Sequence, residues 1–241
     1  MIKLLIKTTL FTLLLSVTTL VSKAQIGYDY AQYDVGLGTT FNQLYGDAET
    51  VKTKAGVFAN FNFNQTPYVN YVAELQAGTL QGGDRESLSG RYFKNKYTAL
   101  VLRVQLQAGE LIDYSNGGVM NVLKNFYVSS GFGYILNSMK APEDINRVAN
   151  VVTSNGERII WPGLDKSNEL YIPARIGYEI KFFNQYNQPS FKIDLGYQFN
   201  MDLSDNMDGF TTGKNKDKMI QYSIGLKFAL GDVTSYRKSV Q

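Results

Sequence analysis

Residues 218–230 read KMIQYSIGLKFAL, and this stretch decides the fold. Every second residue from Ile220 to Leu230 is apolar, whereas the residues between them are small or polar and include Lys227. A period of two is typical of a β-strand whose two faces meet different surroundings. If the apolar face contacts lipid, the other face must line an interior that tolerates polar groups, as in a transmembrane β-barrel.

Seven upstream stretches show the same alternation. A tilted membrane strand needs ~9–11 residues, and each stretch is long enough. The sequence therefore predicts an all-β fold, an eight-stranded antiparallel transmembrane up-and-down β-barrel. Its first seven strands are expected at residues 33–42, 55–63, 70–79, 100–109, 126–136, 171–182 and 191–201.

The first 24 residues have the features of a secretory signal peptide. Lys3 and Lys7 provide a positive start, an apolar run follows, and a small-residue cleavage site ends at Ala24. The alternative, an uncleaved anchor, is disfavoured because the run is shorter than the ~20 residues that span a bilayer. We therefore expect a signal peptide at 1–24 and an outer-membrane barrel at 25–241.

Removing the signal peptide changes the charge balance. It holds three of the 24 basic residues and no acid, so 24 − 3 = 21 bases remain against 21 acids. A formally neutral chain gives no reason to expect a nucleic-acid partner. The expected partners are outer-membrane lipid and the barrel-assembly machinery.

The connections between the predicted strands are unequal in length. Those at 43–51, 82–96, 137–169 and 202–217 are long and are expected outside the cell, whereas two of the other three are tight turns. The connection 110–124 is longer and is expected to contain a helical turn at 119–124. The longest loop, 137–169, shows no persistent periodicity, which predicts a functional or mobile segment. Its expected apolar tip for surface contact consists of Ile159, Ile160 and Trp161.

A soluble barrel of lipocalin type is the main alternative, with the apolar face inward and the polar face in water. Alternation alone does not distinguish a lipocalin-type barrel from a membrane barrel. The polar face is rich in Gly, Asn, Gln and Ser but sparse in the Lys and Glu of a water-facing sheet. Aromatic residues near the strand ends, such as Tyr71, Phe182 and Tyr222, favour a membrane girdle.

Charged residues on the polar face are expected to fill the interior. An eight-stranded barrel is too narrow for an aqueous pore, and buried charges must be paired or hydrated. We interpret them as a polar network that plugs the barrel rather than as a conduction path. Its members are Asp34, Glu74, Arg103, Arg175, Glu179, Lys181, Lys192, Asp194 and Lys227.

The chain has no His and no Cys. A Ser-His-Asp triad, a Cys nucleophile and a His or Cys metal site are therefore excluded, and so are disulfides. A carboxylate pair remains conceivable, but the interior acids lie among five bases, which favours ion pairing. We predict no catalytic residue, no cofactor and no enzymatic activity.

An acidic loop precedes the last strand. Ser204, Asn206, Asp208 and Gly209 have the spacing of a calcium loop, but the first ligand is not Asp and Asn215 stands where a closing Glu is expected. We interpret 202–217 as a solvated acidic loop, with calcium binding as the alternative.

Four short motifs carry a family resemblance: Lys-Ala-Gln at 23–25, Ser-Gly-Phe-Gly-Tyr at 130–134, Tyr-Ile-Pro-Ala-Arg-Ile-Gly-Tyr at 171–178 and Asp-Leu-Gly-Tyr at 194–197. With them the chain resembles small outer-membrane β-barrel proteins of Bacteroidetes. Within that group it is similar to the eight-stranded, OmpA/OmpX-like barrels that accompany type IX secretion. The resemblance implies an outer-membrane location and a periplasmic or secretion-machinery partner.

The last strand also resembles the C-terminal signal read by the barrel-assembly machinery, with Gly225, Phe228 and Leu230 in the signal positions. The chain departs from that pattern because a tail follows Leu230. The predicted function is a non-enzymatic integral barrel that anchors a partner or contacts one at the surface. An anchor would use 110–124 and the tail from Asp232, whereas a receptor would use 137–169.

Overall fold

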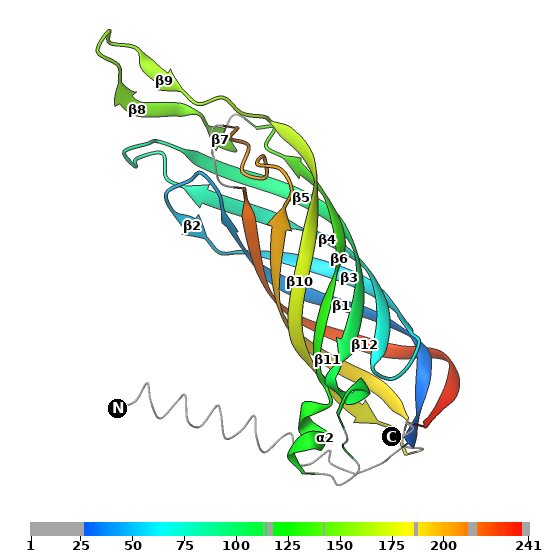
Figure 1. The fold of residues 1–241 in the computed structure, drawn as a ribbon. Coiled ribbons are helices and arrows are strands. Elements are labelled where there is room, and N and C mark those ends of the chain that lie inside the picture. Colours follow the sequence, from blue (N-terminus) through cyan, green and yellow to red (C-terminus); the bar gives the residue numbers. More distant parts are fainter. Residues whose placement is uncertain are drawn as a thin grey trace.

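The computed structural model describes residues 27–112, 114, 118–141, 143–185, 188–211 and 216–237. The expected signal peptide at 1–24, Asn215 and the last four residues lie outside this range. Within it, eight antiparallel strands close into a ring, so the predicted barrel is confirmed (Figure 1). In the order of the ring they are β1 (Gly27–Tyr45), β3 (Lys54–Asn64), β4 (Val69–Gly83), β5 (Tyr92–Gln107), β6 (Phe126–Ser138), β10 (Lys166–Phe183), β11 (Pro189–Asp202) and β12 (Lys218–Arg237).

The first and last strands close the ring. β1 pairs with β12 from Gly27↔Arg237 to Tyr45↔Lys218, with an irregularity between Ala31 and Tyr33. Every other pair of neighbours in the ring is adjacent among these eight strands in sequence, as an up-and-down barrel requires.

The two ends of the barrel differ (Figure 1). One end, here called the loop end, carries the short strands of the long connections. The other, the turn end, carries the helical elements. The short elements are β2 (Val51–Lys52), β7 (Ile145–Asn146), β8 (Val148–Val152) and β9 (Arg158–Ile160) at the loop end, and η1 (Ala108–Glu110) and α2 (Val119–Leu123) at the turn end.

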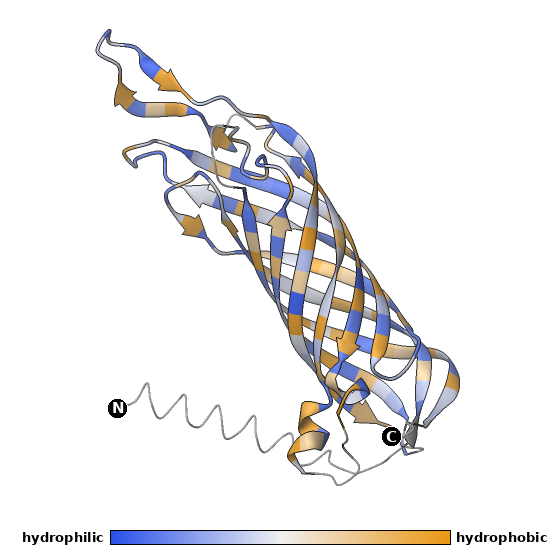
Figure 2. Cartoon of the chain, in the orientation of Figure 1, coloured by the Kyte–Doolittle hydropathy of each residue, from blue (hydrophilic) through white to orange (hydrophobic). Residues whose placement is uncertain are grey.

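Alternation sorts the side chains to the two faces of the ring. On β12, Tyr222, Leu226 and Phe228 are exposed, whereas Gln221 and Lys227 are buried inside. The same alternation of apolar and polar residues runs along the other strands (Figure 2). The apolar face therefore points outward and the charged face inward, which is opposite to the lipocalin-type alternative.

The exterior has the composition of a lipid contact surface. Leu37 and Phe132 are 67% and 71% exposed, and apolar side chains surround them. Aromatic rings cluster near the turn end, where the centroids of Phe191 and Phe228 lie 5.7 Å apart. Such rings at both ends of an apolar band are the girdles of a membrane barrel. No helix in the described part of the chain is long and apolar enough to cross a membrane.

Several strands are longer than the sequence pattern indicates. β5 begins at Tyr92 rather than at 100, β10 at Lys166 rather than at 171, and β12 continues from 230 to Arg237. The ladder continues through these ends, for example at Lys166↔Ser138. Beyond the bilayer the outward face need not be apolar, so periodicity is lost although pairing is kept. The predicted tail from Asp232 is therefore strand as far as Arg237.

Two connections carry structure of their own. The helical turn expected at 119–124 is present as α2. The loop 137–169, which lacks periodicity, contains β7 and the separate two-stranded sheet β8–β9. Strands of two to five residues are too short to give a periodic signal.

The interior at the loop end is apolar, which the sequence pattern did not predict. Its buried residues come from the barrel strands and from the connections above them. Together they close the loop end of the barrel with hydrophobic packing. The cluster consists of Leu44, Leu80, Phe93, Tyr97, Ala99, Val101, Ile135, Met139, Tyr171, Met207, Phe210 and Met219.

Small residues make room for large interior rings. A Cβ on Gly133 would lie 2.2 Å from the ring of Tyr171, and a Cβ on Gly38 would lie 2.4 Å from the ring of Phe58. Glycine at these strand positions is thus explained by close approach of a neighbouring side chain rather than by turn geometry.

Candidate functional site

The structure places all nine predicted network residues inside the barrel. Each is at most 6% exposed. They come from β1, β4, β5, β10, β11 and β12, and ion pairs or hydrogen bonds join them below the apolar cluster. The nine are Asp34, Glu74, Arg103, Arg175, Glu179, Lys181, Lys192, Asp194 and Lys227.

Arg103 and Glu74 form a two-pronged ion pair. Nη2 and Nη1 of Arg103 donate to Oε2 and Oε1 of Glu74 at 2.7 and 3.3 Å. The amide of Gln76 also donates to Oε1, at 2.7 Å. Arg103 and Glu74 occupy adjacent strands, and this planar geometry satisfies both carboxylate oxygens without water.

Tyr127 links the second arginine to its acid. Nη2 of Arg175 lies 3.1 Å from Oδ2 of Asp194. The Tyr127 hydroxyl accepts from Nε of Arg175 at 2.8 Å and donates to Oδ1 of Asp194 at 2.6 Å. The Tyr127 hydroxyl is therefore hydrogen-bonded to both charged groups.

Glu179 is the centre of the network. Its Oε1 accepts from Lys227 Nζ at 2.7 Å and from Gln105 at 3.1 Å, and its Oε2 accepts from Gln107 at 2.6 Å. Lys227 also lies 3.2 Å from Asp194, so this lysine bridges two acids. The acidic partner that a buried lysine requires is thus supplied twice.

The other two lysines have different partners. Nζ of Lys192 lies 2.6 Å from Oδ2 of Asp34, which Asn64 also contacts at 2.9 Å. Nζ of Lys181 donates to the carbonyl of Pro67 at 3.1 Å and to the amide oxygen of Gln107 at 2.7 Å. The nine residues carry five positive and four negative charges, a balance of +1.

Sequence reasoning did not single out the neutral members of this network. Gln105, Gln107 and Tyr127 alternate onto the inward face, so their parity was the available signal. A charged residue on the inward face predicts an interaction partner because a buried charge must be paired. A neutral amide or phenol on the same face does not by itself indicate that it belongs to a hydrogen-bond network.

A tyrosine cluster closes the turn end. Tyr30, Tyr68 and Tyr114 are buried together, with Phe183 and Tyr236 packed against them. Tyr68 meets Tyr114 and Tyr236 edge to face, at centroid distances of 5.7 and 5.8 Å. The charged network therefore lies between two hydrophobic layers, each of which limits access of water.

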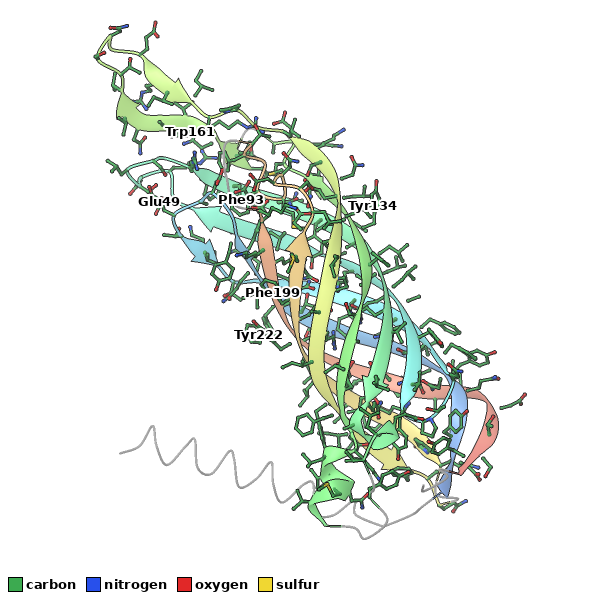
Figure 3. The ribbon with its side chains drawn as sticks, in the orientation of Figure 1. Glu49, Phe93, Tyr134, Trp161, Phe199 and Tyr222 are labelled. Atoms are coloured by element: carbon green, nitrogen blue, oxygen red, sulfur yellow. The ribbon has the colours of Figure 1, made fainter. Side chains whose placement is uncertain are left out.

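The connections at the loop end are joined by Arg91. Its guanidinium lies 4.1 Å from the ring centroid of Trp161 and 5.5 Å from that of Phe210. The same group is 3.6 Å from Asp47. Figure 3 shows Trp161 and Phe93 together at this end. Cation–π contacts of this kind stabilise packed loops.

This packing corrects the expected apolar tip. Trp161 is partly buried against the apolar cluster, at the base of the β8–β9 hairpin rather than at its tip. Ile159 is only partly exposed, whereas Ile160 is 72% exposed. The turn that joins β8 to β9 is polar, so the apolar residues lie along the strands of the hairpin.

The acidic connection before β12 is also buried, so the description as a solvated loop is wrong for Asp202, Asp208 and Asp217. Asp217 accepts from the backbone of Met207 at 2.7 Å, and Asp208 accepts from that of Asp47 at 2.7 Å. Burial raises the pKa of Asp208 to about 7 and, with the nearby Asp208 charge, that of Asp217 to about 9. In the described residues no group of three or more His, Cys, Asp or Glu is arranged to hold a metal ion.

The predicted assembly-signal residues take different positions on β12. Phe228 and Leu230 face outward and are exposed, whereas Gly225 faces inward beside Phe58. A Cβ on Gly225 would lie 2.7 Å from that ring.

The apolar exterior, the girdles and the closed antiparallel ring define a barrel of the outer-membrane type. The protein is located in the cell outer membrane. Neither protein-family models nor curated sequences match the chain.

Similar folds are found among solved structures. The Neisserial surface protein NspA is 10% identical, with a TM-score of 0.43, and the match covers 84% of this chain and 99% of that one. Ail, the attachment invasion locus protein of Yersinia pestis, is 10% identical, with a TM-score of 0.44 and coverage of 86% and 99%. The N-terminal barrel domain of Pseudomonas aeruginosa OprF is 11% identical, with a TM-score of 0.34 and coverage of 82% and 99%.

Proposed function

We propose that this protein is a non-enzymatic barrel with a structural interior and a contact surface outside the cell. The loop end faces outward and the turn end faces the periplasm, following the usual difference in connection length. All four network carboxylates accept from cationic or neutral donors within the barrel. Such acids are engaged as acceptors, which argues against a role as a catalytic pair.

The β8–β9 hairpin carries the contact surface. It forms a separate two-stranded sheet that projects beyond the ring (Figure 1). Val151, Val152 and Ile160 are exposed along it. In the described part of the chain no strand other than β8 pairs with β9, so a partner could add a strand at the β9 edge, whereas Asn150 joins β8 to the carbonyls of Arg85 and Ser87.

Photo-cross-linking on intact cells tests this proposal. A photoreactive residue at Val151 should capture an external protein, and one at Thr234, exposed at the turn end, should not. With the photoreactive residue kept at Val151, the substitutions V152D and I160D should abolish the capture while the barrel still forms. Equal capture from both positions, or none from Val151, would reject the hairpin as the contact surface.

A periplasmic anchor is the second candidate. Leu111, Val119 and Met120 are exposed at the turn end, on η1–α2. An apolar patch of this kind fits a protein partner in the periplasm. The resemblance to barrels that accompany type IX secretion suggests a secretion component as that partner. Capture from a photoreactive residue at Met120, with none from Val151, would favour this function.

A further inference from the structure

A set of lysines lies on the outside of the barrel at the loop end. Strand alternation and register place their side chains on the lipid-facing side rather than in the interior. Lys96 pairs across to Ser138, and Ser138 pairs across to Lys166, so these two lysines lie two strands apart, roughly 10 Å. We name this set the lysine collar: Lys52, Lys94, Lys96, Lys166 and Lys218.

The collar has no acidic counterpart on the same surface. Among described strand residues that face outward at the loop end, none is Asp or Glu. No collar lysine forms an ion pair within 4.0 Å with another described residue. Among the loop acids, Asp165 pairs with Arg147 at 3.0 Å and Asp47 with Arg91 at 3.6 Å, whereas Glu49, Asp84 and Glu86 are exposed in the connections beyond the strands.

The height of the collar matches that of lipid headgroups. Tyr134 projects outward from β6 below it and marks the interface (Figure 3). Leu100 pairs with Tyr134, and Lys96 is four residues beyond Leu100 along β5, or roughly 14 Å. Aromatic girdles lie at headgroup level, and with a strand tilt of roughly 40° Lys96 stands about 11 Å farther out, from where its long side chain can reach back toward the charged layer of the bilayer.

Arg85 extends the basic surface beside Lys52. Nζ of Lys52 lies 5.8 Å from the ring centroid of Tyr92, and the Arg85 guanidinium lies 5.0 Å from it. Tyr92 faces outward, and its hydroxyl accepts from the amide of Gln81 at 3.2 Å. Basic residues therefore occur on β2, β5 and β10 and, with Arg85, in the connection that follows β4.

We propose that the lysine collar binds the phosphate groups of anionic glycolipid headgroups in the outer leaflet. Ammonium groups attract phosphates as point charges, and clusters of four to eight bases at a bilayer surface are typical of anionic-lipid binding. An outward position at headgroup height fits a lipid, which surrounds the barrel laterally. This inference rests on the proposed orientation, with the loop end outside.

The test measures lipid binding by the full barrel in phosphatidylcholine nanodiscs that contain fluorescent bis-phosphorylated lipid A. Energy transfer from a dye at the loop end reports enrichment of this lipid around the protein. The wild-type barrel should enrich it at least about tenfold over the same lipid without phosphates, and about 0.5 M salt should weaken the enrichment.

Three variants test whether the enrichment depends on the collar lysines or on the overall positive charge of the loop end. K94Q/K96Q/K166Q should lose most of the enrichment, and K94R/K96R/K166R should keep it because the charge remains. K140Q/K216Q, which changes two exposed loop lysines outside the collar, should match the wild type. Equal enrichment by wild type and the Gln variant, or by phosphorylated and dephosphorylated lipid, would overturn the proposal.

The Arg variant controls for misfolding because it changes the same positions as the Gln variant. The folding of each barrel is first checked by its heat-dependent shift on SDS gels. A membrane-impermeant amine label on intact cells tests orientation separately. Labelling of the loop end with no lipid enrichment would reject the collar alone, whereas labelling only after the membrane is opened would reject the proposed orientation as well.

Discussion

Glu179→Gln should destabilise the barrel strongly, because it removes the charge at the centre of the interior network. Glu179 is fully buried and accepts three hydrogen bonds, including one from Lys227 at 2.7 Å. Gln has the same shape but is neutral, and its NH₂ group would face donors. The change therefore leaves Lys227 with Asp194, 3.2 Å away, as its acidic partner.

The magnitude follows from this geometry. Breaking one partner of a buried ion pair costs about 3–5 kcal/mol. Since Lys227 keeps Asp194, we expect the lower end, a decrease of about 3 kcal/mol in the free energy of unfolding. K227M alone should cost a similar amount, whereas E179Q/K227M should cost less than the sum, with a coupling energy of about 2 kcal/mol.

Urea unfolding of barrels inserted in vesicles measures these values, with tryptophan fluorescence as the signal. The matched control is Glu157→Gln, an exposed acid in the β8–β9 turn, for which we expect a change within about 0.5 kcal/mol. If E179Q behaves like this control, or if the two network substitutions add without coupling, the interior pairs do not stabilise the fold and our reasoning is wrong.

Three other changes test different parts of the structure. Phe228→Asp places a charge on the lipid-facing girdle, where the cost near the interface is up to about 1 kcal/mol, and should reduce the heat-shifted barrel band on SDS gels; normal assembly would contradict the assigned face. Gly38→Val should cost about 1–3 kcal/mol in the urea assay by overpacking against the Phe58 ring and the Ile224 carbonyl oxygen, and Phe58→Leu should rescue it only in part because the contact with the carbonyl stays. The raised pKa values of Asp208 and Asp217 mean that the folded connection favours their protonated forms, so its stability is present at low pH and is lost progressively as pH rises through about 7 to about 9. Proteolysis within 203–217 should therefore be faster at about pH 9.5 than at about pH 6, and D208N/D217N should remove this difference.

The sequence by itself determined the barrel. Eight alternating stretches fix eight strands because the side-chain period of a strand is two, and a slip of one residue would turn every lysine or arginine of the inner face toward lipid. Together with the sparse charge on the polar face and the aromatic residues near the strand ends, the alternation predicted Phe228 on the exterior and Glu179 and Lys227 in the interior. Absence of His and Cys, which composition alone establishes, excluded the common hydrolytic and metal chemistries.

Only the tertiary structure decided which groups meet. Glu179 and Lys227 are 48 residues apart, and Asp34 and Lys192 are 158 apart, so closure of the ring rather than sequence proximity pairs them. Trp161 could be assigned to a loop from the sequence, but its contact with Arg91 depends on how two connections fold over the barrel. The lysine collar shows the same limit, because its members become neighbours only through the register of adjacent strands.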